Sequence, residues 1–256
     1  MSSWSRKRHN RILTGIIFIL VVFLAFIIIP KLKKQPNCFD QIQNGNEKGI
    51  DCGGSCALFC SFEVKPVLVK WFRALPVQGN FYNAVVYIEN QNKNAIIKDI
   101  NYEFKFYDEN NVFITEKKGH TFVGIGTSSI LEPLVDMKGH NPARTTFKFI
   151  EQQQFTKINQ NLENVFVSVE EKNLTNEDTS PKLFAVLKNN SKYNLTDVEV
   201  VALLYDKDLN AVSASRTYVD SLIAGQTGRI FFTWPNPFLT EISKIEIIPR
   251  LNYINI

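Results

Sequence analysis

Hydrophobic and polar positions divide the chain into an N-terminal apolar run and a long alternating part. The run extends from Ile12 to Ile29 without a charged residue. As a helix it would be about 27 Å long, close to the thickness of a bilayer core. Pro30 is expected to end this helix. A cleaved signal peptide would have a shorter apolar region and a small-x-small cleavage site, so the pattern predicts an uncleaved signal anchor at residues 12–30 behind a tail at residues 1–11.

From Phe62 onward, apolar and polar positions alternate with a period of two, and short runs are separated by Asn, Gly and Asp. One such run, 102–107, is followed by a polar turn at 108–111 and a resumed strand. A second, 198–205, is followed by a turn at 206–210. Each arrangement is typical of a β-hairpin.

The two hairpins indicate an internal repeat, because Tyr107-Asp108 and Tyr205-Asp206 lie 98 residues apart. The same offset aligns further pairs, namely Asn92 with Asn190, Ile100 with Val198, Val86 with Phe184 and Ile88 with Val186. We therefore expect an all-β protein with two tandem antiparallel immunoglobulin-like β-sandwiches, at residues 62–170 and 171–256, each with roughly seven strands. The run 165–169 fits either the end of the first sandwich or the start of the second.

The four cysteines lie close together at residues 31–61, just beyond the apolar run. They are Cys38, Cys52, Cys56 and Cys60. An even number in a short polar segment predicts two disulfides, formed in an oxidising compartment, with three possible pairings. Zinc is the alternative, but its sites usually contain paired C-x2-C motifs. The disulfides place the bulk of the chain outside the cytoplasm, with the N-terminus inside and one span in the plasma membrane.

The cysteine segment is also rich in side-chain oxygens. Calcium, which takes six to eight oxygen ligands, is one explanation. Turn capping by Asp and Asn side chains is the preferred explanation, because the spacing fits no EF-hand loop. The calcium candidates are Asp40, Asn44, Asn46, Glu47 and Asp51.

The distribution of charge along the chain indicates which partners to expect. The chain carries a formal +4, but residues 1–34 contain seven basic residues and no acid, which leaves a net −3 on residues 35–256. A nucleic-acid-binding protein would carry its basic excess on the folded part. The expected partners are therefore the lipid bilayer and an envelope protein, with no nucleic acid.

Two segments resemble known families. The pattern from Cys38-Phe-Asp40 through Asp51-Cys52-Gly53-Gly54-Ser-Cys56 is similar to the DCGG stalk segment of bacterial surface and secreted proteins. The runs Ala202-Leu-Leu-Tyr-Asp206 and Leu222–Phe231 resemble an FxLYD-type immunoglobulin-like domain. The whole arrangement resembles single-pass envelope proteins of bacteria, which implies a fold and a location but no catalytic residues.

The sequence offers little for catalysis. Its three histidines, His9, His120 and His140, lack a second ligand at metal-binding spacing. We expect no enzyme activity and no cofactor, but a structural or interaction role. The alternative is a ligand-binding module for cell-wall glycan or calcium, and a sugar-stacking face could come from Trp71, Trp234, Phe231, Phe232 and Phe238.

Overall fold

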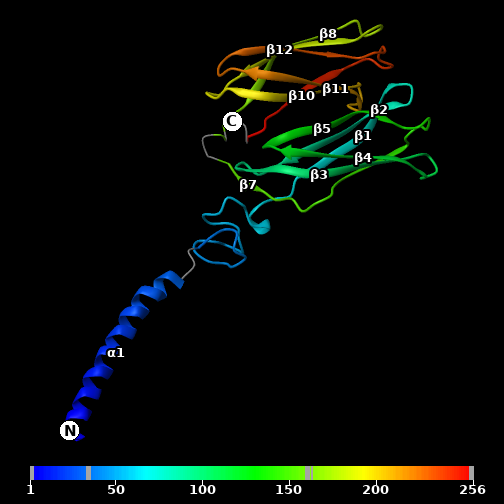
Figure 1. Ribbon diagram of the computed structural model, residues 1–256. Helices are drawn as coiled ribbons and strands as arrows, with labels where there is room; N and C mark the ends of the chain where they lie inside the picture. Colours follow the sequence, from blue (N-terminus) through cyan, green and yellow to red (C-terminus); the bar gives the residue numbers. More distant parts are fainter. Residues whose placement is uncertain (1–2, 33–35, 159–161, 163, 254–256) are drawn as a thin grey trace.

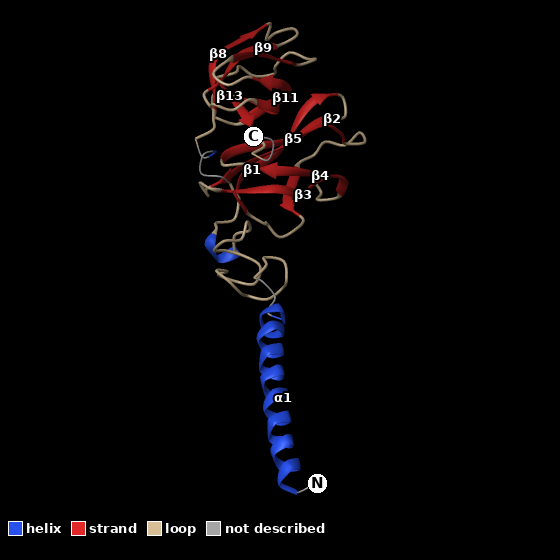
Figure 2. Ribbon diagram, turned by 60° about the vertical axis from the view of Figure 1, so that its left-hand side comes forward, coloured by secondary structure: helices blue, strands red, loops and turns tan. Residues whose placement is uncertain are grey.

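The computed structural model describes residues 3–32, 36–158, 162 and 164–253. Among these residues the chain forms one long helix followed by antiparallel strands, and Figure 2 shows the helix, the cysteine segment and the strand-rich part following one another. The elements are α1 (Ser3–Leu32), η1 (Ser61–Glu63), β1 (Leu68–Gln78), β2 (Phe81–Asn90), β3 (Ala95–Tyr107), β4 (Phe113–Val123), β5 (Gly126–Asp136), β6 (Arg144–Phe149), β7 (Thr156–Lys157), β8 (Val167–Thr175), β9 (Lys182–Asn189), β10 (Leu195–Tyr205), β11 (Ala211–Leu222), β12 (Thr227–Thr233) and β13 (Lys244–Arg250).

Within helix α1, the described side chains present an apolar surface that no other described residue buries. The stretch His9–Ile27 is long and apolar enough to cross a membrane, and none of it is buried. A core helix of a soluble protein would be covered, so the finding is compatible with an anchor or a signal sequence. The expectation that Pro30 ends the helix is wrong, because α1 continues to Leu32. Proline removes one backbone hydrogen bond, and this close to the C-terminus that loss does not prevent a further partial turn.

The first sandwich consists of two antiparallel sheets. One has the strand order β1-β2-β5 and the other β4-β3-β6, with the short β7 paired to β3. Alternate side chains of β2 and β3 meet between the sheets, as period-two strands require. Ile88, Phe104, Phe106 and Met137 are among the core residues and are essentially inaccessible to solvent.

The second sandwich repeats this arrangement with sheets β12-β9-β8 and β11-β10-β13. Strands β1 to β6 therefore correspond in order to β8 to β13. Strand β8 pairs with β9, so the run 165–169 opens the second sandwich. The second sandwich therefore includes β8 from Val167 onward, a few residues before the expected start at residue 171.

Both expected hairpins are confirmed, as β3–β4 and β10–β11. In each, the first aspartate of the turn holds the backbone. Asp108 Oδ1 accepts hydrogen bonds from the N–H groups of Asn110 and Val112, and Asp206 Oδ1 accepts from Asp208 and Asn210. The Asn210 N–H holds the pKa of Asp206 below its usual value. These turns are stabilised by the chain's own amides.

The alignment at an offset of 98 holds for β3 and β10 but not for β2 and β9. Val86 and Ile88 lie in the first core, whereas the second core contains Leu183, Ala185 and Leu187 instead of the expected partners Phe184 and Val186. The correct offset here is 99, because a shift of one residue turns a strand's side chains to the opposite face.

A buried asparagine marks the same position in both sandwiches. Asn90 donates to the carbonyls of Ala95 and Gly124, and Asn189 donates to those of Tyr193 and Leu222. Each ties the end of one strand to the end of another across the loop. These residues, and not Asn92 and Asn190, are therefore the structural equivalents.

The two sandwiches are stacked. Figure 1 shows sheet β1-β2-β5 lying next to sheet β11-β10-β13. A third apolar cluster fills the space between them and draws on both sandwiches: Leu75, Val85, Leu131, Val201, Leu203, Tyr205, Ala211, Ala214 and Ile248. We call this contact the seam. The sandwiches therefore form a single block of four sheets with three apolar layers.

Candidate functional site

The four cysteines form two disulfides within the cysteine segment. Cys38 is bonded to Cys56, and Cys52 to Cys60, with Cα–Cα distances of 5.7 and 5.0 Å. Gly54 is required here, since its φ is +52° and a Cβ would collide with the Asn46 carbonyl oxygen. The crossed pairing folds the segment into a compact unit.

This unit is attached to the first sandwich by backbone hydrogen bonds. The Phe59 N–H donates to the Phe155 carbonyl (2.9 Å), and the Lys157 N–H donates to the Ala57 carbonyl (2.8 Å). The Phe59 side chain also packs against the first core. The cysteine segment is therefore fused to the sandwich block.

The three carboxylates among the calcium candidates, Asp40, Glu47 and Asp51, accept hydrogen bonds from the chain's own amides. Asp51 accepts from the N–H groups of Asp40 and Gln41, and Glu47 Oε2 accepts from the Asn44 N–H (3.1 Å). Asp40 accepts from the Ile42 N–H and from the Asn44 amide. Asn44 Oδ1 is buried without a partner among the described residues. One such oxygen is far fewer than the six to eight that calcium takes, so the geometry favours turn capping.

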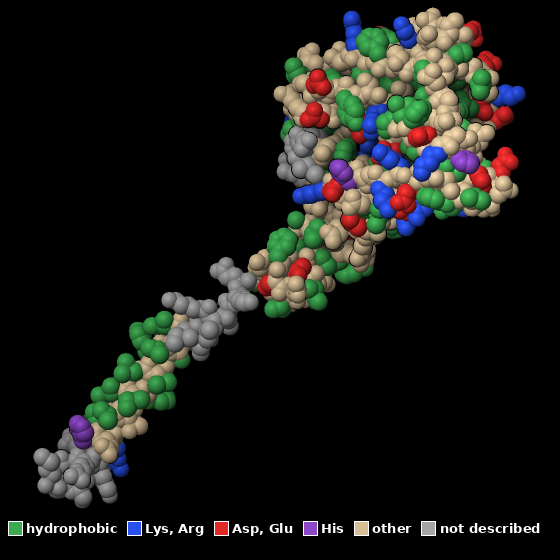
Figure 3. All heavy atoms as spheres, turned by 45° about the vertical axis from the view of Figure 1, so that its right-hand side comes forward, with side chains coloured by type: hydrophobic (Ala, Val, Ile, Leu, Met, Phe, Trp, Pro, Cys, Tyr) green, Lys and Arg blue, Asp and Glu red, His purple; other side chains and the backbone are tan. Residues whose placement is uncertain are grey.

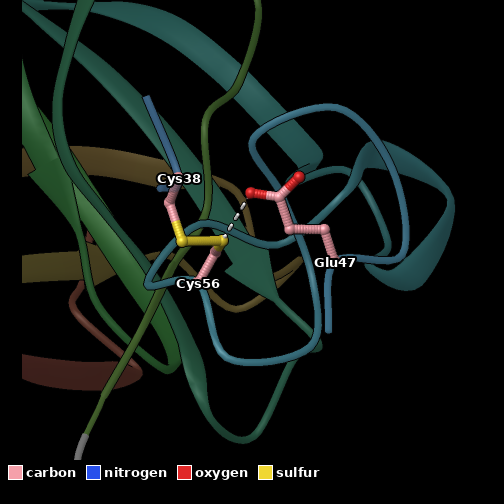
Figure 4. Close-up of side chains that lie close together, drawn as sticks. All are labelled: Cys38, Glu47 and Cys56. Atoms are coloured by element: carbon pink, nitrogen blue, oxygen red, sulfur yellow. Dashed lines mark hydrogen bonds between the residues drawn. A yellow bond between two sulfur atoms is a disulfide. The ribbon is translucent and has the colours of Figure 1, made fainter. Parts of the chain in front are cut away.

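A carboxylate also lies beside one disulfide, as Figure 4 shows. Glu47 Oε1 is 3.3 Å from Cys56 Sγ, and suitable ligand atoms of Cys38, Glu47 and Cys56 lie within 4.8 Å of one another. Metal ions bind cysteine as the thiolate, and both sulfurs here are consumed in the disulfide. The cluster therefore suits a metal only after reduction.

The histidines are not brought together. His9 is on α1, His120 is on β4 and His140 is in the loop after β5, and all three are exposed. The aromatic residues named as a sugar-stacking face are also divided. Phe232 and Trp234 are buried in the second core, Phe231 is exposed beside Phe184, and Trp71 stacks on Tyr87 at the seam. The expected common face is therefore absent from these residues.

The most elaborate polar arrangement is centred on Arg250, the last residue of β13. Its side chain is almost completely buried and reaches across the seam to donate to Ser128 Oγ, Thr121 Oγ1 and the Phe122 carbonyl of the first sandwich. Its charge is balanced within its own sandwich by Glu199 (2.6 Å). A buried guanidinium with this many partners fixes the relative orientation of the two sandwiches.

Further polar contacts cross the seam. Asn83 Nδ2 donates to the Ala214 carbonyl, and Arg216 donates to the Leu131 carbonyl. Tyr87 and Tyr205, one from each sandwich, both donate to the Glu246 carboxylate (2.7 and 3.0 Å). Burial and the neighbouring carboxylate raise the pKa of Tyr87 to about 12 and also raise that of Tyr205.

A groove of about 710 Å³ opens at one edge of the seam, between the end of β1 and the segment that follows β12. Its lining includes Leu75, Pro76, Pro235, Phe238 and Leu239, with Arg73, Gln78 and Asn236 among its polar residues. A neighbouring groove of about 620 Å³ shares Val77, Gln78, Trp234 and Pro235 with it. We refer to both together as the seam groove.

Trp234, at the junction of the two grooves, is 7% exposed, and its Nε1 has no hydrogen-bond partner among the described residues. At the rim Leu239 is 93% exposed. Because this nitrogen is itself buried, a ligand in the groove would contact the apolar lining and the polar residues beside it. The seam groove is the candidate binding site.

The seam was not predicted from the sequence. Strand β10 is almost completely buried from Val198 to Tyr205, on both faces. An uninterrupted apolar strand is typical of burial on both sides, whereas a free sandwich would show alternation. The run Val200-Val-Ala-Leu-Leu-Tyr205 therefore carried the signal.

No model of a known protein family matches the chain, and no curated protein matches it. Solved structures similar to it include red sea bream transglutaminase, with 10% identity over 74% of this chain and 30% of that chain, at a TM-score of 0.25. Two β-glucuronidases are also similar. The one from Bacteroides uniformis has 14% identity over 68% of this chain and 22% of that chain (TM-score 0.19), and one of glycoside hydrolase family 2 has 12% over 81% and 26% (TM-score 0.21). The chain spans less than a third of each, and likeness this distant says nothing of activity.

Proposed function

We propose that the chain is a membrane-anchored extracytoplasmic structural or interaction protein without catalysis. The observation that carries the proposal is the seam, which joins the two sandwiches into one block. The cysteine segment is attached to this block, and the apolar helix α1 precedes it in the chain. A rigid block on a single helix is suited to holding a binding surface at a fixed height above a membrane.

The distribution of charged side chains supports a non-catalytic role. The buried Glu199 is neutralised by Arg250, and Glu246 accepts from two tyrosines. Glu103 lies among Lys105, Lys118 and Lys148 on the outer face of β3. Each of these acids has a structural charge or hydrogen-bond partner, and Glu199 Oε1, which has no hydrogen bond among the described residues, lies 3.6 Å from Arg216. A catalytic carboxylate needs room for a substrate.

The partner we assign to the seam groove is a protein segment that brings apolar side chains to its apolar lining. A photo-crosslinking amino acid in place of Leu239 should capture one partner in intact cells. The same amino acid in place of Ile223, which is 57% exposed and does not line the groove, is the matched control. Equal capture from both positions would contradict the assignment.

The anchor and its orientation need a separate test. In sealed inside-out vesicles of the plasma membrane, protease added outside should cut within residues 1–11 and spare the block. Digestion of the block there would overturn the topology. Glycan or calcium binding is the alternative function, and heat released on titrating the purified full chain with either ligand would favour it.

A further inference from the structure

Four large apolar side chains of the cysteine segment point into solvent. The exposed fractions are 77% for Phe39, 54% for Ile42, 62% for Ile50 and 73% for Phe62. Figure 3 shows hydrophobic side chains on the surface of this segment, between the helix and the sandwich block. Such residues are costly to expose in a small polar segment, and a group of them marks a contact surface.

The four residues lie on neighbouring parts of the chain. Asp51 binds the N–H groups of Asp40 and Gln41, which brings the stretch 39–42 beside Ile50. A Cβ on Gly49 would lie 3.7 Å from a ring carbon of Phe62, so that ring lies close to Gly49, the residue before Ile50. We call Phe39, Ile42, Ile50 and Phe62 the apolar patch.

The patch is rigidly supported. The disulfide Cys52–Cys60 joins the stretch around Ile50 to that around Phe62. A charge-assisted hydrogen bond from Lys48 Nζ to Glu63 (2.6 Å) closes the same region and lowers the pKa of Glu63. Attachment to the sandwich uses other residues, Gly54, Ala57 and Phe59. The patch is therefore on a part of the segment that the sandwich leaves uncovered.

The length of the chain keeps the patch close to the end of α1. Only four residue steps separate Leu32, the last helical residue, from Pro36, which is roughly 14 Å when fully extended. The apolar run ends at Ile29, and a headgroup layer is about 5 to 8 Å thick. If α1 spans a bilayer, the cysteine segment must lie at or just above the lipid headgroups.

We propose that the apolar patch is a membrane-contact surface, which seats the cysteine segment in the headgroup region and sets the tilt of the sandwich block. The proposal rests on the anchoring role of α1 proposed above. Aromatic and aliphatic side chains beside a transmembrane helix favour this interfacial layer. Lys31, Lys33 and Lys34 follow the apolar run directly and suit the same layer.

Lipid photolabelling of the full chain in nanodiscs tests the contact. The discs contain phosphatidylcholine, phosphatidylglycerol and a lipid with a diazirine near its glycerol group, and reduced tryptic peptides are analysed by mass spectrometry. We expect adducts on peptides 35–48 and 49–70, which carry the patch, several-fold above those on peptide 230–244. That control peptide carries the exposed Phe231 and Leu239 of the second sandwich.

Peptide 12–31 reports on the anchor in the same experiment. Adducts on it without adducts on the patch would overturn the membrane contact and leave the anchor intact. No adducts on it would overturn the anchor itself. A crosslink between two copies through the patch would make a second copy the occupant and would also contradict the proposal.

A double variant, Ile50→Ser with Phe62→Ser, should lower labelling of peptide 49–70 several-fold and leave peptide 12–31 unchanged. Both side chains are exposed, so folding should be kept, and intact disulfides by mass spectrometry would verify this. The control variant Phe231→Ser should change neither peptide. Equal labelling of the double variant and the natural chain would refute the assignment.

Discussion

The two sandwiches have the same strand order, yet corresponding strands bury different faces. On β3 the outward positions are Glu103 and Lys105, which form an ion pair, and Lys118 and Lys148 also pair with Glu103 and cover it. The corresponding positions of β10 are Val201 and Leu203, both buried in the seam. The same fold thus has a charged free surface in one copy and an apolar joining surface in the other. Topology alone does not decide how tandem sandwiches associate, because the outward residues decide it.

We expect the largest loss of stability when an outward position of β10 receives a charged residue like those on β3. Leu203→Lys removes a fully buried leucine and places an unpaired charge in the seam, so we expect a loss of more than about 4 kcal/mol in unfolding free energy. The matched variant Lys105→Leu should change stability by less than about 1 kcal/mol, since Glu103 keeps Lys118 and Lys148 as partners and the lysine side chain is partly exposed. Urea unfolding of the full chain in detergent, followed by tryptophan fluorescence, measures both. Similar losses from both variants would mean that the seam is not a stabilising contact.

The next largest effect is expected at Arg250. Arg250→Met leaves the buried Glu199 with only the more distant Arg216 (3.6 Å) as its cation and leaves Ser128 and Thr121 without their donor, so we expect a loss of about 3 to 5 kcal/mol. The double variant Arg250→Met with Glu199→Met should recover part of this loss, because no uncompensated charge remains.

The exposed Arg229 on β12 offers the control for this pair, and Arg229→Met should change stability by less than about 0.5 kcal/mol. Unfolding in urea at pH 7 measures all three variants. A double variant less stable than Arg250→Met alone would show that Glu199 is not held by the arginine.

These residues also show how far sequence reasoning reaches. The uncharged run at 12–29 and the period-two alternation are local signals, and they sufficed for an apolar helix and two β-sandwiches. The seam depends on which outward faces meet, a property of residues 85 to 159 positions apart in its hydrogen bonds, such as Leu131 with Arg216 and Tyr87 with Glu246. Only the unbroken apolar run in β10 indicated it.

The candidate site was less predictable than the fold. Pairing of the cysteines could not be chosen because three pairings fit the spacing, and the seam groove is lined by residues of both sandwiches. The offset error between β2 and β9 has a similar cause. A loop that differs by one residue preserves the alternation of each strand but changes which residues correspond.

Alkaline pH should weaken the seam by a smaller amount. The folded pKa of Tyr87 is about 12, above the unfolded value of 10. Its contribution to stability is therefore complete below pH 10 and is lost as the pH rises through 12, because the unfolded chain releases the proton first. We expect stability to fall by about 1.4 kcal/mol per pH unit for this tyrosine between those values.

Urea unfolding at pH 9 to 12 checks the slope, and Tyr87→Phe isolates the contribution of Tyr87. Burial raises the pKa of Tyr102 and Tyr205 as well, so the variant should show a shallower decline and not a flat one. Identical slopes for the variant and the natural chain would show that Tyr87 keeps an ordinary pKa and that the Glu246 contact does not form.

The smallest effect is expected in the two equivalent hairpin turns. At the same position both turns have a residue with a positive φ, but the residue differs between the sandwiches. Asn111 has a φ of 60° and Leu209 a φ of 61°. Asparagine tolerates this left-handed conformation, whereas for leucine it costs about 1 kcal/mol. Leu209 is 66% exposed, so little packing offsets that cost.

Leu209→Asn should therefore raise the unfolding free energy by about 0.5 to 1 kcal/mol. Leu239→Asn, at a more exposed leucine without a positive φ, should leave it unchanged. An equal gain at both sites would attribute the effect to lower surface hydrophobicity, and a gain at Leu209 alone would assign it to the backbone that the two turns share.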